Sequence, residues 1–126
     1  MKIASLVARY LLGIIFVVFS LNMWLHFIPV PPPAEGSPAA AFMGAIYPTG
    51  YLSVVKVLEL LGGILLLSGR FVNLALAILG PIVINIALYH FFLVKGGYPM
   101  AILVVILAIV ALAGRREFLK SLLAAK

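Results

Sequence analysis

The chain has 126 residues, of which 66% are hydrophobic and only 10% are charged. Soluble domains are close to half apolar and one quarter charged, so this composition excludes an ordinary soluble domain and indicates a protein that lies in lipid. The net charge of +6 falls mainly at the ends of apolar segments, which is typical of membrane orientation and not of nucleic-acid binding. The lack of cysteine excludes disulfides and thiolate metal sites.

Four apolar segments predict transmembrane helices over about residues 7–28, 51–68, 72–94 and 99–113. Backbone polar groups must be satisfied within the chain in lipid, which leaves helices as the structure of these segments. The second and fourth segments are short for a hydrocarbon core that takes about 20 residues to cross. We therefore predict an all-α protein, a membrane-embedded antiparallel four-helix bundle that forms one domain over residues 1–126.

The first loop contains a proline-rich stretch and a predicted short helix. The residues from Pro29 to Pro33 favour extended polyproline geometry. Ser37 followed by Pro38 is typical of a helix N-cap and first position, so the sequence predicts a helix over about residues 39–47. Because this helix is mostly apolar, we expect it to lie at the outer membrane interface, either packed over the end of the bundle or as a gate above a ligand site.

Basic residues predict the orientation. The side that holds the termini and the second loop carries seven of them, and the other side carries only Lys56 and Lys95; the seven are Lys2, Arg9, Arg70, Arg115, Arg116, Lys120 and Lys126. The positive-inside rule then places both termini in the cytoplasm, as expected for a multi-pass protein of the bacterial inner membrane. Most aromatic residues of interfacial type gather toward the opposite end: Trp24, Tyr47, Tyr51, Tyr89 and Tyr98.

Six polar side chains within the spans are predicted near that same outer end: Asn22, His26, Lys56, Glu59, Asn85 and His90. Ionisable groups in a span are costly, so they are expected to point into the bundle and to find partners. One interpretation is structural, with Lys56 neutralising Glu59 and the asparagines bonding across helices. A second is a site for a polar headgroup such as a quinone, or a proton acceptor at Glu59. A third is a haem, pigment or metal ligated by His26 or His90.

Glycine and proline are predicted to shape the helices. Gly62 and Gly63 follow Glu59 by one turn and favour close approach of a neighbouring helix. Pro81 is expected to bend the third span. Phosphate loops, nucleophile elbows and paired carboxylates are absent from the sequence, which predicts no catalytic residue and no dedicated metal site.

The pattern Lys56-x-x-Glu59-x-x-Gly62-Gly63, followed by residues 65–70 (Leu-Leu-Leu-Ser-Gly-Arg), resembles the second-helix signature of the DoxX-like family of small four-span membrane proteins. Arg9-x-x-x-Gly13 is similar to the start of its first helix, and residues 21–29 and 85–92 resemble a bacterial subset. Many members carry a lysine late in the first helix, where this chain has Asn22 to His26. The resemblance implies the four-span fold and quinone-associated redox work.

Three functional hypotheses follow. The first is a non-catalytic accessory subunit of a redox-linked, quinone-connected membrane assembly, respiratory or photosynthetic, which docks on larger subunits or self-associates. The second is the quinone-reducing membrane subunit of an oxidoreductase. The third is a small proton-coupled transporter that uses Glu59 as its coupling carboxylate.

Overall fold

The computed structural model of the chain describes residues 2–29 and 31–124; Val30, in the predicted proline-rich stretch, and Lys126, one of the predicted basic residues, lie outside this part. The described residues are mostly helical and include no strand, which confirms the all-α prediction. In chain order the elements are α1 (Lys2–Leu25), α2 (Pro38–Ile46), α3 (Tyr51–Ser68), α4 (Val72–Leu88), the π-helical segment η1 (Tyr89–Val94), α5 (Tyr98–Ala113) and α6 (Arg116–Leu123).

Three helical segments are long and apolar enough to cross a bilayer, namely α1, α3, and α4 continued by η1. At 1.5 Å per residue α5 is only about 24 Å long, and a bend of 97° separates it from α6. The predicted boundaries 51–68 and 72–94 agree with the structure, but α1 begins earlier than predicted and ends earlier, at Leu25. It ends there because His26 adopts the left-handed conformation, with φ 52°.

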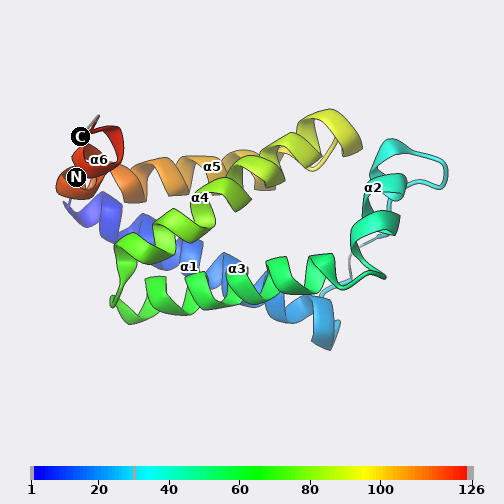
Figure 1. Ribbon diagram of the computed structural model, residues 1–126, viewed down its shortest axis with the longest axis horizontal. Coiled ribbons are helices and arrows are strands. Elements are labelled where there is room, and N and C mark those ends of the chain that lie inside the picture. The colour runs from blue at the N-terminus through cyan, green and yellow to red at the C-terminus, as the bar shows by residue number, and fades with distance from the viewer. Residues whose placement is uncertain (1, 30, 125–126) are drawn as a thin grey trace.

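Each of the four longest helices contacts two others, because α1 lies against α3 and α5, and α4 lies against the same two. Neighbouring helices run in opposite directions (Figure 1). The N-terminal residues, the α3–α4 turn and α6 therefore lie together, at what we call the converging end. At the opposite end, where α2 lies, the α1–α3 pair separates from the α4–α5 pair (Figure 1). We call this the splayed end.

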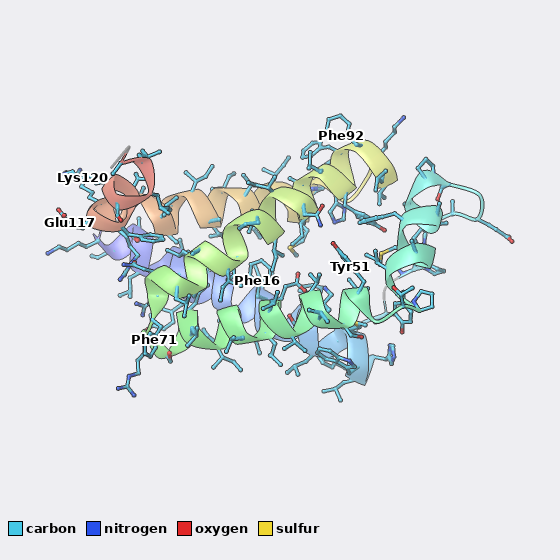
Figure 2. All side chains as sticks on the ribbon, in the orientation of Figure 1. Phe16, Tyr51, Phe71, Phe92, Glu117 and Lys120 are labelled. Atoms are coloured by element: carbon cyan, nitrogen blue, oxygen red, sulfur yellow. The ribbon has the colours of Figure 1, made fainter. Side chains whose placement is uncertain are left out.

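Apolar side chains from α1, α3, α4 and α5 form the core. Phe16 lies near its middle (Figure 2), and the buried members are Ala8, Leu12, Phe16, Leu66, Val72, Ala75, Leu76, Leu79, Val83, Val104, Leu107 and Ala111. Burial of one large aliphatic or aromatic side chain stabilises a protein in water by about 1.5–3 kcal/mol. In lipid that driving force is weak, and close van der Waals packing carries more of the stability.

Glycines allow this packing at the α1–α3 contact. A Cβ atom on Gly63 would lie 2.9 Å from Cγ2 of Val17 and 3.0 Å from the carbonyl oxygen of Gly13. On the other side, a Cβ on Gly62 would lie 2.7 Å from Cγ of Leu79 in α4. The prediction that Gly62 and Gly63 permit close helix approach is therefore confirmed, and Gly13 is the partner of Gly63 across the contact.

The short helix in the first loop is also confirmed. The Ser37 side chain accepts a hydrogen bond from the Ala40 N–H, and Pro38 occupies the first turn of α2. Phe42 of α2 packs edge to face on Tyr89 of η1, with ring centroids 5.7 Å apart. The helix thus rests on the α4 side of the splayed end (Figure 1).

Pro81 lies inside α4, and the helix continues beyond it to Leu88. The irregularity that the sequence did not predict comes eight residues later, where η1 widens the helix from Tyr89 to Val94. Lys95 ends η1 in the left-handed conformation, with φ 56°. The last helix, α6, was likewise not predicted, because the last predicted helix ends at residue 113.

Candidate functional site

Glu59 points into the centre of the helix assembly. Gly62 and Gly63 follow it by three and four residues. Viewed down the axis of α3, they therefore lie on either side of the direction in which the Glu59 side chain points. Gly62 faces Leu79 of α4, and Gly63 faces Val17 of α1. The Glu59 side chain is therefore directed between α1 and α4, and the residue is only 4% exposed.

Lys56 forms the predicted ion pair with Glu59. Its Nζ lies 3.0 Å from Oε2 of the carboxylate, and the two side chains are 23% and 5% exposed. Apart from this contact, the buried Oε2 atom has no partner among the described residues. The pair thus neutralises a buried carboxylate and leaves one of its oxygens able to accept a further hydrogen bond.

Ser20 belongs to the same region, although the sequence analysis did not single it out. It is 1% exposed, and its Oγ has no hydrogen-bond partner among the described residues. Seven residues make about two helical turns, so residues seven apart lie on the same face. Ser20 therefore shares a face of α1 with Gly13, and Lys56 shares a face of α3 with Gly63. Since α1 and α3 are antiparallel, and Gly63 also contacts Val17, Ser20 lies within about one helical turn of the level of Lys56 and Glu59. The sequence feature that could have identified Ser20 is its place as a single small polar residue in an apolar segment, two turns after Gly13.

Asn22 is buried but serves the backbone of its own segment. Its Nδ2 donates to the carbonyl of Ile28 at 3.0 Å, and its Oδ1 accepts from the Ile28 N–H at 2.7 Å. These two bonds fold the chain back after α1 ends. The interpretation of Asn22 as part of a shared cluster, or as a bond between helices, is therefore corrected: the chain reversal uses its hydrogen-bonding capacity.

The two histidines lie apart. His26 is exposed at the end of α1, and Nδ1 of His90 donates to the carbonyl oxygen of Gly96 at 3.0 Å. The ends of α1 and of η1 lie on opposite sides of the splayed end (Figure 1). His26 and His90 therefore do not share a ligand in this structure, and His90 instead closes the turn after η1.

Asn85 is exposed and lies on the opposite face of α4 from buried Val83. Two residues of a helix are about 200° apart around the axis, which explains this difference in facing. The prediction of one common cluster of six residues is thus wrong for His26, Asn85 and His90, and also for Asn22. The structure keeps Lys56 and Glu59 together and adds Ser20.

This Ser20–Lys56–Glu59 cluster can hold charge, accept a hydrogen bond or exchange a proton at the carboxylate. Among residues 2–29 and 31–124, no group of three or more His, Cys, Asp or Glu side chains is arranged to hold a metal ion. The hydroxyl of Ser20 and the Oε2 atom of Glu59 are the two polar groups that could hydrogen-bond to a small polar partner.

A second polar region, absent from the predicted site, lies at the converging end. Two hollows of about 590 and 140 Å³ open there, and Lys2 and Arg115 line both. The Nε–H of Arg115 donates to Oδ1 of Asn73, which ties the end of α5 to the start of α4. The sequence analysis predicted these basic residues on the side that holds the termini. It could not predict that they surround a cavity, because the cavity depends on the bend before α6.

A comparison with protein-family models, curated proteins and solved structures finds no match to this chain.

Replacement of Lys56 by Met is expected to lower the free energy of unfolding by about 3 kcal/mol, because Glu59 then stays buried without its counter-charge. Replacement of both Lys56 and Glu59 by Met removes both charges and should return stability to within about 1 kcal/mol of the wild type. Denaturant titration in mixed micelles, followed by circular dichroism, measures both. A double variant as unstable as the single one would contradict the structural role of the pair.

Replacement of Asn22 by Ala is expected to destabilise the fold by about 1–3 kcal/mol, because two backbone groups of Ile28 lose their partner. Asn85→Ala is the matched control, since an exposed side chain changes stability by about 0.5 kcal/mol or less. The same titration compares the two variants. Equal losses in both would show that the chain reversal does not depend on the Asn22 bonds.

Proposed function

We propose that this protein is a DoxX-like integral membrane protein whose four antiparallel helices form a bundle in the bacterial cytoplasmic membrane. The observation that carries this proposal is the apolar outer surface of its helices. On α3, for example, exposed side chains follow a helical stripe: Val54, Val57, Leu58, Leu61 and Ile64. A surface of this kind is suited to lipid or to other membrane helices.

The two ends of the molecule support a bundle that spans the membrane with both termini in the cytoplasm. Described basic residues cluster at the converging end: Lys2, Arg9, Arg70, Arg115, Arg116 and Lys120. Exposed aromatic residues that suit the headgroup level gather toward the splayed end: Trp24, Tyr47, Tyr51 and Tyr98. This division follows the positive-inside rule and the usual place of Trp and Tyr at interfaces.

Within the membrane, we propose that the protein is a non-catalytic accessory subunit of a redox-linked, quinone-connected assembly. Two of its polar side chains, Asn22 and His90, bond to the backbone of their own segments and so stabilise the fold. The resemblance of residues 56–70 to the DoxX-like signature supports a link to quinone chemistry. The wide apolar flanks favour docking on a larger membrane subunit.

Purification of the tagged chain from its native membranes in a mild detergent tests this role. The expected result is co-purification with redox subunits and lipid-extractable quinone, because the apolar flanks of the bundle are buried against those partners. A control eluate from cells without the tag identifies adventitious material. A stable monomer without quinone or redox partners would contradict the proposal; if that monomer carried a Glu59-dependent, pH-driven flux in proteoliposomes, the transporter hypothesis would replace it.

A further inference from the structure

The converging end carries an open basic groove, which we define by its polar lining residues Lys2, Asn73, Arg115, Arg116 and Glu117. Its volume is about 590 Å³, and Ala113 and Gly114, where α5 ends, also line it. The groove exists because α6 turns away from α5 by 97° and lies across the end of the helices. Phe118 anchors α6 there by packing against the core.

A smaller cavity of about 140 Å³ adjoins the groove and shares Lys2 and Arg115 with it. Arg9 also lines this cavity, and its Nε–H is buried without a hydrogen-bond partner among the described residues. The guanidinium stays in place by stacking on Tyr10, with its carbon 4.7 Å from the ring centroid. This buried N–H therefore lacks the acceptor that most buried donors have, and its positive charge adds to that of the groove beside it.

The charge balance of the region is strongly positive. Four cations line the two hollows, from Lys2, Arg9, Arg115 and Arg116, against the single carboxylate of Glu117. Within the described part of the chain, none of the four forms an ion pair, since the pair recorded there is Lys56–Glu59. Asn73 orients the Arg115 guanidinium by accepting from its Nε–H. The remaining N–H groups of that side chain are available to an anion.

We propose that the basic groove binds the phosphate of an anionic phospholipid headgroup. Arginine and lysine around a concave site are suited to phosphate oxygens, and basic pockets between membrane helices at the cytoplasmic side bind such headgroups. Leu6, which lines the smaller cavity and is exposed on the outer side of α1, can contact an acyl chain where the lipid leaves the groove. This inference rests on the proposed function, because it is the proposed membrane placement that would bring α6 to the headgroup level.

Native mass spectrometry of the detergent-solubilised full chain, titrated with phosphatidylglycerol and separately with phosphatidylcholine, tests the proposal. The wild type is expected to retain phosphatidylglycerol in preference to phosphatidylcholine. The test variant K2Q/R116Q removes two groove cations that make no hydrogen bond or ion pair in the described residues. It should weaken phosphatidylglycerol binding about thirtyfold, from about 1 kcal/mol for each basic residue.

The matched control is R70Q/K120Q, which removes the same charge from the same end at exposed positions outside both hollows. It should bind within about threefold of the wild type, since it leaves the groove intact. R115Q is a second test variant, in case the first fails to fold. Equal losses in test and control variants would overturn the site, because they would reduce it to bulk charge.

Inorganic phosphate distinguishes the source of the ligand. Phosphate at millimolar concentration should not displace phosphatidylglycerol, because the acyl chains add binding that the free ion lacks. Binding of phosphate alone as tight as that of the lipid would overturn the lipid assignment, and so would equal retention of phosphatidylcholine. If the protein is recovered outside the membrane fraction, the proposed function itself is contradicted. If it is recovered in the membrane fraction but binds both lipids equally, only this inference is contradicted.

Discussion

The close approach of α1 and α3 at Gly13 and Gly63 is the constraint on which the rest of the structure depends. A Cβ at Gly63 would lie within 3.0 Å of the Gly13 backbone, so the two helices meet closely at this level. The contact sets the register of the pair. That register brings Ser20 to within about one turn of the level of Lys56 and Glu59. Together with the adjacent Gly62–Leu79 contact, it also directs Glu59 between α1 and α4. The buried charge therefore takes its position from the glycines.

The two ends of the molecule differ because their connections differ. At the converging end a short turn joins α3 to α4, and the Ser5 hydroxyl donates to the Ala111 carbonyl at 3.0 Å, which holds α1 against α5. At the splayed end a long loop with its own helix joins α1 to α3, and η1 widens the end of α4. Separated helix ends cannot bond to one another, which explains why Asn22 and His90 bond to Ile28 and Gly96 instead.

Sequence periodicity predicted most of the fold, since apolar runs and the Ser37–Pro38 cap gave the helices to within a few residues. It also predicted the Lys56–Glu59 pair, because residues three apart share a helix face. The position of a residue along its helix could not predict which polar groups meet, because the face of the helix decides it. Asn85 and Glu59 were both predicted near the outer end, but Asn85 points away from the core. Ser20 and the basic groove were missed because they depend on helix register and on the bend before α6.

The stability of Gly63→Ala tests the close α1–α3 contact most directly. A Cβ on residue 63 would lie 2.9 Å from Cγ2 of Val17 and 3.0 Å from the Gly13 carbonyl oxygen, so the two helices must move apart to accommodate it. Denaturant titration in mixed micelles should show that this variant is destabilised by about 1–3 kcal/mol. Gly80→Ala in α4 is the matched control, because a Cβ on residue 80 would meet no atom within 4 Å, and it should keep or slightly raise the stability of the wild type. Equal stability of the two variants would contradict the account.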